Sequence, residues 1–319
     1  MSTREIVMLG TASQSPTRHR NHNGYALRWD DRLVFFDPGE GFQRQCTMAG
    51  IAIARADAVC LTHFHGDHCL GVPGLIARRG ADQCTEPLAF WYPGDGQDYF
   101  DKLATCTASM ALPPLDPRPI MGVGGPVGSI GSGGAGSGHG ALTVTTLPLR
   151  HRVTAFGYRL QEPDGRSFDP AALAARGISG PDVGRLASDG WLDTADGRVT
   201  LEEVSSPRKG QSMAFVMDTA VCDSIVELAD GVDLLVIEST FLHRDAELAE
   251  KYRHLTARQA GELGAAAGAR RVVLTHFSQR YGSGASRDEV LPFVEEASAF
   301  HGDVWGALDF DVVEVPPRV

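Results

Sequence analysis

Short apolar runs recur along the chain, and most of them end in polar or glycine-containing sequence. Apolar runs that are bounded by turn residues predict β-strands. The runs are IVMLG, YALRW, LVFFDPG, AVCLTH, LAFWYPG, LTVTTLPLRH, AFGYRL, MAFVMDT, DLLVIEST and RVVLTH. Helical patterns occur among the later runs: TAVCDSIVELADG, TARQAGELGAAAG with Thr256 as the expected N-cap, and SRDEVLPFVEEASAF with Ser286 as the expected N-cap. Strands in each half that alternate with helices predict a layered α/β sandwich.

Two segments depart from this pattern. Residues Gly122 to Gly140 have the sequence GVGGPVGSIGSGGAGSGHG, which we expect to form a mobile loop because glycine-rich sequence buries little apolar surface. The second segment, from about Gln161 to Gln211, interrupts the strand pattern with turn residues and short amphipathic pieces. We expect a single domain over residues 1–319, with this segment inserted as a flexible arm at about 162–210.

Length and composition are those of a globular enzyme. The 319 residues are 43% hydrophobic and 22% charged, which suits one domain with a sizeable core. No signal-peptide pattern is present, and no apolar run reaches the roughly 20 residues of a membrane helix, so we expect a cytoplasmic protein without a membrane partner. The six cysteines form no CxxC pair, which argues against a disulfide framework and a thiolate zinc site. The net charge of -11 disfavours non-specific binding to polyanions, although a local basic patch remains compatible with RNA.

The segment LTHFHGDH crowds three histidines and an aspartate directly after an apolar run. In an extended chain His63 and His65 share a face, so both can reach one metal ion. Gly66 then lets the backbone turn and direct Asp67 and His68 toward a second metal ion. Imidazole and carboxylate ligands suit zinc, with manganese or iron as competitors. The cluster therefore predicts a metal site.

Four ligands from one loop are too few for two metals, so other ligands are expected elsewhere. His151, Asp218 and His276 each follow an apolar run, in LTVTTLPLRH, MAFVMDT and RVVLTH. Open α/β sheets bind ligands at the carboxyl ends of their strands, so we expect these residues to meet the first cluster at one edge. Asp218, a short carboxylate with two oxygens, is the natural bridge between metals about 3.5–4 Å apart.

The set formed by HxHxDH, a distant histidine, the aspartate of MDT and a final histidine resembles the metallo-β-lactamase superfamily, whose fold is an αββα four-layer sandwich with a two-metal site. Finer motifs resemble those of RNase Z, a family of tRNA 3′-processing endonucleases. These motifs span nearly the whole chain and are LGTASQSPTRHRN, DPGEGFQRQ, THFHGDHCLGVPGL, HRVTAFGYRL, MDT, ESTF, HLTARQAGELG and HFSQRY.

The resemblance implies a short-form, homodimeric endoribonuclease that removes the 3′ trailer from precursor tRNA. Cleavage would leave a 3′-hydroxyl on the tRNA and a 5′-phosphate on the trailer. Two zinc ions per subunit are implied, with manganese as the alternative. The resemblance assigns the two ions, with Asp218 bridging them, to the ligand sets His63, His65 and His151, and Asp67, His68 and His276.

The resemblance also implies catalytic roles. Asp67 would accept the proton of the attacking water, because a carboxylate beside the nucleophile has the reach of a general base. His254, in RHLTA, would protonate the leaving 3′ oxygen, and Glu238, in ESTF, would orient His254.

Several polar residues are expected to contact the RNA. Arg280 in HFSQRY would hold a phosphate, since a guanidinium matches phosphate geometry. By resemblance, Arg18, Arg20 and Asn21 of PTRHRN would face the nucleotides beside the cut.

The arm carries a further part of the resemblance. The segment GISGPDVGRL, residues 177–186, resembles the glycine-proline motif of an exosite that grips the tRNA elbow, which places Arg185 among the tRNA-binding residues. However, residues 162–203 carry four arginines against nine acidic residues. An RNA clamp gains affinity by neutralising phosphates, so this charge balance departs from the expected one.

Two other functions compete with this interpretation. Small-molecule hydrolases of the same fold, such as phosphodiesterases or lactonases, would share HxHxDH and the later histidines but would lack the arm and PTRHRN. A non-catalytic RNA-binding protein on this fold would have lost metal ligands, whereas every expected ligand is present here. A flavodiiron-like oxidoreductase fits poorly, because that family has no use for a histidine at the place of His68 and carries an appended flavin domain, which we do not expect here.

Overall fold

The computed structural model describes residues 3–108, 112–131 and 140–317. The chain divides into two compact units, of which the first comprises Met1–Gln161 and Ser212–Val319 and the second comprises Glu162–Gln211. The second unit coincides with the segment for which an inserted arm is expected from the sequence.

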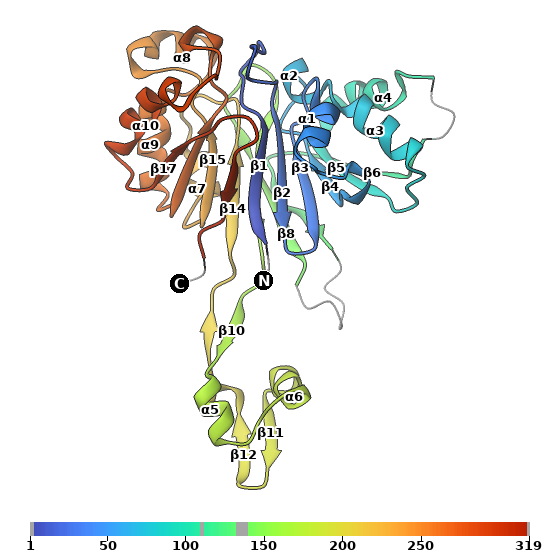
Figure 1. Ribbon diagram of the computed structural model, residues 1–319, viewed down its shortest axis with the longest axis vertical. Coiled ribbons are helices and arrows are strands. Elements are labelled where there is room, and N and C mark those ends of the chain that lie inside the picture. The colour runs from blue at the N-terminus through green and yellow to red at the C-terminus, as the bar shows by residue number, and fades with distance from the viewer. Residues whose placement is uncertain (1–2, 109–111, 132–139, 318–319) are drawn as a thin grey trace. The chain divides into compact units, whose positions relative to one another are not determined.

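The first unit contains two seven-stranded sheets (Figure 1). The strands of the first sheet are β1 (Arg4–Gly10), β2 (Gly24–Trp29), β3 (Arg32–Phe36), β4 (Ala58–Cys60), β5 (Leu88–Pro93), β6 (Leu115–Ile120) and β18 (Val312–Glu314). Their spatial order is β18-β1-β2-β3-β4-β5-β6, with antiparallel pairing up to β3 and parallel pairing from β3 to β6.

The strands of the second sheet are β7 (Gly125–Ile130), β8 (Leu142–Leu149), β9 (Ala155–Gln161), β14 (Ser212–Val216), β15 (Leu234–Glu238), β16 (Arg271–Thr275) and β17 (Val304–Gly306). Their order is β17-β16-β15-β14-β9-β8-β7, parallel from β17 to β14 and antiparallel beyond. Strands β14 and β15 are buried along their whole length, because both of their faces are covered.

The helices of the first unit are α1 (Phe42–Met48), α2 (Gly66–Cys69), α3 (Val72–Ala81), α4 (Gln97–Thr105), α7 (Asp223–Leu228), α8 (Ala246–Tyr252), α9 (Ala257–Ala266) and α10 (Leu291–Ser298). Single 3₁₀ turns occur at η1 (Ile53–Arg55), η2 (Gly94–Gly96), η4 (His243–Asp245), η5 (Gln279–Tyr281) and η6 (Arg287–Glu289).

Three apolar clusters define four layers. The inner faces of the two sheets meet in one core, where the rings of Phe36 and Phe215 stack with centroids 4.5 Å apart. Helices α1, α3 and α4 cover the outer face of the first sheet, and α7, α9 and α10 cover that of the second (Figure 1). Each large apolar side chain buried in this way stabilises the fold by roughly 1.5–3 kcal/mol. The predicted αββα sandwich is therefore confirmed.

The apolar runs correctly predicted every central strand of the two sheets. Of the two expected helix N-caps, one is confirmed and one is wrong. Thr256 caps α9, and its hydroxyl accepts a hydrogen bond from the backbone N–H of Gln259. Ser286 instead precedes the short turn η6 and makes no side-chain cap hydrogen bond, while α10 starts only at Leu291. The expected cap at Ser286 was thus wrong, because residues Arg287–Glu289 form a separate 3₁₀ turn before the helix begins.

The glycine-rich segment departs from expectation. Its residues Gly125–Ile130 form the edge strand β7, which pairs with β8, and Ile130 is only 3% exposed. Gly124, Gly125 and Gly128 have positive φ angles, so glycine here permits a bulged edge strand instead of abolishing order. The expectation of a mobile loop over 122–140 is wrong for this part of the segment, and residues 132–139 lie outside the described residues.

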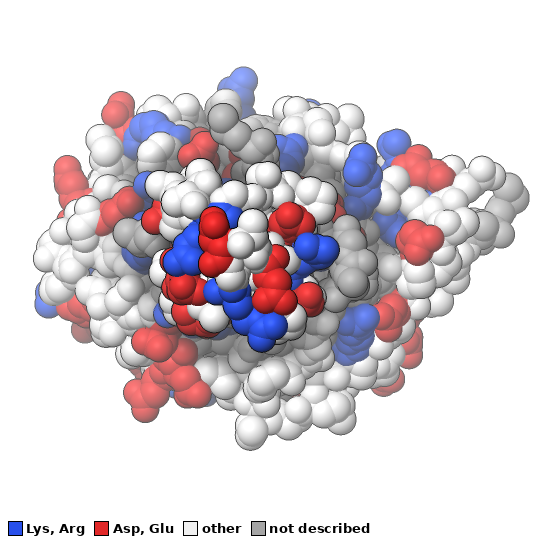
Figure 2. Space-filling view, turned by 90° about the horizontal axis from the view of Figure 1, so that it is seen from below, with Lys and Arg blue, Asp and Glu red and all other residues white. Residues whose placement is uncertain are grey.

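The second unit has its own small core. Its elements are β10 (Gly165–Phe168), α5 (Pro170–Ala175), α6 (Pro181–Asp189), β11 (Trp191–Thr194), β12 (Gly197–Thr200), η3 (Leu201–Glu203) and β13 (Ser205–Arg208). β10 pairs with β13 and β11 with β12, around an apolar cluster that includes Leu186 and Val199. Acidic and basic side chains are interspersed on its surface (Figure 2). Among the helices of the described residues, none is long and apolar enough to cross a membrane.

Candidate metal centre and active site

The residues predicted to bind metal lie at the carboxyl ends of four strands, as the sequence indicated. His63 follows β4, His151 follows β8, Asp218 follows β14 and His276 follows β16. The backbones of Asp218 and His276 are left-handed, with φ of 36° and 63°, and Asp37 after β3 is left-handed as well, at 42°. Non-glycine residues adopt this conformation at an energetic cost, and such residues cluster at functional sites.

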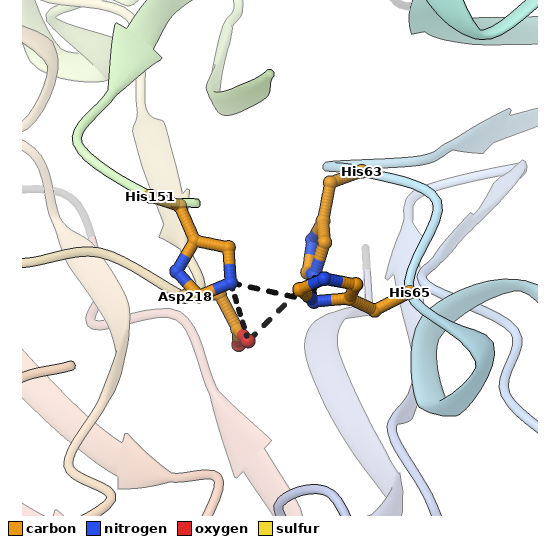
Figure 3. Close-up of side chains that lie close together, drawn as sticks. All are labelled: His63, His65, His151 and Asp218. Carbon is orange, nitrogen blue, oxygen red and sulfur yellow. Dashed lines mark hydrogen bonds and ion pairs between the residues drawn. The ribbon is translucent and has the colours of Figure 1, made fainter. Parts of the chain in front are cut away.

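The first group of ligands comprises His63, His65, His151 and Asp218 (Figure 3). The Nδ1 atom of His65 lies 3.0 Å from Nε2 of His63 and 3.3 Å from Nε2 of His151. Both of those Nε2 atoms lie 3.6 Å from Oδ2 of Asp218. Three ring nitrogens and one carboxylate oxygen thus face a common point.

The second group comprises Asp67, His68 and His276. Oδ2 of Asp67 lies 3.3 Å from Nε2 of His68 and 3.8 Å from Nε2 of His276. The other oxygen of Asp218, Oδ1, lies 3.3 Å and 3.1 Å from the same two nitrogens. Asp218 therefore directs one oxygen to each group, which is the geometry of a bridging ligand.

Outer partners hold the histidine rings in place. Asp37 accepts hydrogen bonds from the backbone N–H of Thr62 at 2.7 Å and from Nδ1 of His68 at 2.8 Å. The Thr240 hydroxyl lies 2.7 Å from Nδ1 of His276, and Nδ1 of His151 donates to the carbonyl of Arg253 at 3.1 Å. Such contacts fix ring orientation and raise ligand basicity.

Sequence reasoning missed the role of the outer partner Asp37. The available signal was its place in LVFFDPG, directly after a predicted buried strand, as for the predicted metal ligands.

The chemistry of the donors fits divalent cations. Burial lowers the pKa of His63, His65 and His151, that of His151 to about 4, so these rings are neutral near pH 7 and their nitrogens can donate lone pairs. Burial opposes ionisation of Asp218 too, but the neighbouring histidines outweigh it and hold the pKa of Asp218 well below its usual range.

Two buried atoms of this cluster are without hydrogen bonds. Oδ1 of Asp218 and Nε2 of His276 have no hydrogen-bond partner among the described residues. Buried polar atoms rarely remain unsatisfied in proteins, and a bound cation would satisfy both.

His254 and Glu238 form a pair beside this centre. Nδ1 of His254 lies 3.0 Å from Oε1 of the fully buried Glu238, and its Nε2 lies 4.0 Å from Asp218. Glu238 also accepts hydrogen bonds from the backbone N–H of Thr219 and the hydroxyl of Thr240. Burial works to lower the pKa of His254, but the charges of Glu238 and Asp218 raise it to about 9. His254 also shares a potential ligand group with Asp218 and His276.

An open cleft of about 530 Å³ gives access to the centre. Asp67, His254 and Arg280 line it, and Arg280 is exposed without an acidic partner within the described ranges. Arg18 is exposed in its loop, but it does not line this cleft. Arg185 belongs to the second unit, where it pairs with Asp182 at 3.2 Å.

Arg20 and Asn21 are structural anchors of their loop. Arg20 is only 4% exposed and donates to the Thr11 hydroxyl at 2.9 Å. The Asn21 side-chain amide donates to the carbonyl of Glu40. Asp309 accepts hydrogen bonds from the backbone N–H groups of Thr11 and Asn21, at 2.9 and 2.7 Å. The PTRHRN loop is therefore fastened by its own polar side chains.

Comparison with known proteins defines the class of enzyme. Residues 17–150 match the family model of the metallo-beta-lactamase superfamily, and residues 197–277 match that of the beta-lactamase superfamily domain. The fold is similar to that of human tRNase Z, short form, with a TM-score of 0.67 and 21% identity, over 98% of this chain and 100% of the human chain. The protein thus has the metallo-β-lactamase fold, with groups of residues that could hold metal ions.

Full-length relatives narrow the class further. The chain is 50% identical to ribonuclease Z of Thermobifida fusca, over 100% of this chain and 96% of the relative. It is also 50% identical to ribonuclease Z of Nocardia farcinica over the whole of both chains. The chain belongs to the ribonuclease Z family, and it is a metal-dependent endoribonuclease.

Proposed function

We propose that this enzyme removes the 3′ trailer from precursor tRNA, leaving a 3′-hydroxyl on the tRNA and a 5′-phosphate on the trailer. The observation that carries the proposal is the division of the two Asp218 oxygens between two histidine groups. A site for two neighbouring cations suits phosphodiester hydrolysis. The names of the full-length relatives and of the human structural neighbour support tRNA as the substrate.

Two zinc ions, or manganese in their place, are the cations that the donor set suits. When bound, they would lower the pKa of a shared water and polarise a phosphoryl oxygen. The ligands would be His63, His65 and His151 for one ion, Asp67, His68 and His276 for the other, and Asp218 for both.

Asp67 is the proposed general base. It lines the cleft, and its Oδ2 atom approaches His68 and His276, so the carboxylate faces the position where water would enter. The charge of His68 outweighs burial and holds the pKa of Asp67 below its usual range. An ionised carboxylate in this position can accept the proton of the attacking water.

His254 is the proposed general acid. The contact with Glu238 engages Nδ1 and turns Nε2 toward the centre, where an RNA 3′ oxygen would leave. The alkoxide of RNA leaves poorly without a proton, so an oriented imidazolium accelerates the step. Glu238 is a positioning residue in this scheme, because its carboxylate is fully buried and contacts His254 instead of the cleft.

Substrate contacts are proposed for exposed cations around the site. Arg280 would bind a phosphate beside the cut, and Arg18 would contact flanking nucleotides. Arg20 and Asn21, which fasten the same loop, would act by fixing its shape. A homodimer is proposed from the family resemblance, and the second unit, with Arg185, would contact the tRNA elbow.

The decisive experiment maps product ends. Purified protein would be mixed with a 3′-extended precursor tRNA and zinc or manganese, with Asp67→Ala as the inactive control. We expect a single cut beside the discriminator base, a 3′-hydroxyl on the tRNA, and no cut by the variant. Metal-loaded protein that spares the RNA but hydrolyses small phosphodiesters or lactones would overturn the tRNA proposal. Near-normal turnover by Asp67→Ala would remove Asp67 from its role.

A further inference from the structure

We propose that Arg152 and Tyr252 form a binding subsite for the last nucleotide that the tRNA retains. Both side chains line the cleft, both are exposed, and the Arg152 Cζ atom lies 5.8 Å from the centre of the Tyr252 ring. A cation beside an aromatic face is a common device for holding a nucleotide, since the cation binds a phosphate and the ring stacks on a base. This inference rests on the proposed function and names a further part of the same site.

Ion pairing distinguishes Arg152 from its neighbour Arg150. Arg150, two residues earlier, makes an ion pair with Glu250 and does not line the cleft. Arg152 has no acidic partner in the parts of the chain that the structure describes. An unpaired guanidinium at the edge of an acidic metal centre is available to an incoming phosphate.

The segments that carry the pair are held together beside the catalytic groups. Tyr252 ends helix α8, and Arg253 turns the chain with a left-handed φ of 58°. The Arg253 carbonyl accepts from Nδ1 of His151, and the Arg253 guanidinium donates to the His151 carbonyl. The segment that carries Tyr252 and His254 is therefore fastened to the segment that carries His151 and Arg152.

The position of the pair indicates which side of the cut it binds. The nucleotide upstream of the cut carries the leaving 3′ oxygen, and His254 is the group proposed to protonate it. Tyr252 lies two residues from His254, whereas Arg280 belongs to the segment that follows His276. The upstream base would therefore stack on Tyr252, and the phosphate preceding that nucleotide would meet Arg152. Stacking on a ring without contacts to base edges accepts any base.

Matched variants test the subsite. Arg152→Ala and Tyr252→Leu are each expected to raise KM for precursor tRNA about tenfold, the range of one lost stacking or phosphate contact, with a smaller effect on kcat. Arg150→Ala removes an arginine two residues from Arg152 that is already paired and does not line the cleft, so its KM should stay within about twofold of the wild-type value. Tyr252→Phe, which keeps the ring, should restore most of the affinity that Tyr252→Leu loses. Arg152→Ala should also reduce the slope of log KM against log salt by about one.

Modified substrates locate the nucleotide. One precursor would carry an abasic site at the last retained nucleotide, and a second would carry it at the first trailer nucleotide. Tyr252→Leu should have no further effect on the first substrate and should keep its roughly tenfold effect on the second. The reverse pattern would overturn the assignment to the upstream side.

Two further outcomes would contradict the subsite. Equal losses for Arg152→Ala and Arg150→Ala would mean that only the overall charge matters. Equal losses by the Tyr252→Leu variant on precursor tRNA and on bis(p-nitrophenyl) phosphate, which has no base to stack, would assign the ring to support of the metal centre. Failure of the wild-type protein to cut precursor tRNA is visible before any variant is compared, and it would remove the proposed function together with this inference.

Discussion

The ends of strands β4, β8, β14 and β16, which carry the predicted metal ligands, form what we call the rim of the first unit. The rim and the surface of the second unit both bring ionisable groups together, but these groups are buried at the rim and exposed on the second unit. At the rim, His63, Asp218 and His276 are almost completely buried, and two of their atoms lack hydrogen-bond partners among the described residues. In low-dielectric surroundings such groups are costly unless a counter-charge is supplied. A bound cation would supply this counter-charge at the rim.

In the second unit most of the arginines are already paired with acidic residues. Arg176 pairs with Glu203 at 3.2 Å, Arg185 with Asp182 at 3.2 Å and Arg198 with Asp193 at 2.9 Å. These pairs are exposed, and surface pairs stabilise a fold by about 0–1 kcal/mol each. Residues 162–211 hold nine acidic against six basic residues, so few positive charges remain for phosphates. Similar ionisable residues can thus bind ions where they are buried and lack partners, whereas they contribute little more than local order where they are exposed and paired.

The largest effect is expected from Asp218→Ala. The variant removes an oxygen from each ligand group, so both cations should bind far more weakly, and cleavage should fall by at least about 10³-fold. Metal content after dialysis and the rate of precursor cleavage would be measured together. Asp230→Ala removes an exposed aspartate of the same unit and serves as the control. Full metal content and activity in Asp218→Ala would show that Asp218 is not a shared ligand of the two cations.

The next effect concerns the pair of His254 and Glu238. His254→Ala is expected to lower kcat by about 10²–10³-fold through loss of the general acid. Glu238→Gln should lower kcat less, because the imidazole remains but loses the charge that orients it. If Glu238 acts through His254, the double variant should be no slower than His254→Ala alone. Additive losses in this cycle would assign Glu238 a separate role.

Asp309 is a partly buried carboxylate outside the rim. Burial raises the pKa of Asp309 to about 6, despite the hydrogen bonds that it accepts. Below its unfolded pKa, near 4, the group is protonated in both states; between about pH 4 and 6 the unfolded chain releases the proton and the folded protein keeps it. The stability that Asp309 contributes should therefore fall by about 3 kcal/mol as pH rises through this window.

The measurement is urea unfolding of wild type and Asp309→Asn at a series of pH values. The variant keeps the shape of the side chain but does not titrate. The difference in unfolding free energy between the two proteins should move in favour of the variant from about pH 4 to 6. Parallel pH dependences would show that the carboxylate titrates alike in both states.

The smallest effect is expected in the second unit. Asp182→Asn releases Arg185 from its ion pair and should lower KM for precursor tRNA by about two- to fivefold, because one guanidinium becomes available to a phosphate. Asp196→Asn changes the net charge equally, but Asp196 has no arginine partner among the described residues. An identical shift in both variants would mean that net charge, not pairing, limits tRNA binding.

The clustering of the residues at the rim could be predicted from the sequence for a physical reason. His63, His151, Asp218 and His276 each follow an apolar run, and the ends of buried strands can lie only at the edge of a sheet. The same logic predicted the layers, because the central strands are nearly continuous in apolar residues.

Features that depend on tertiary pairing were not predictable in this way. Strand β7 is glycine-rich, and it is ordered through its partner β8, which no local pattern shows. The burial of Arg20 depends on Thr11 and on the ring of Phe277, which lies 4.7 Å from its guanidinium. The contact between Arg152 and Tyr252 joins segments a hundred residues apart, and Arg253, which follows Tyr252, contacts His151 on the other segment.

The four strand ends at the rim come from both sheets of the sandwich: β4 belongs to the first sheet, and β8, β14 and β16 belong to the second. A cation held between His63 and His151 would consequently cross-link the two sheets, in topology like a disulfide that closes a long loop. Removing the cations with a chelator should then loosen the interface between the sheets, so amide hydrogens at the ends of β4 and β16 would exchange faster together. Metal binding at this centre would therefore also stabilise the contact between the two sheets.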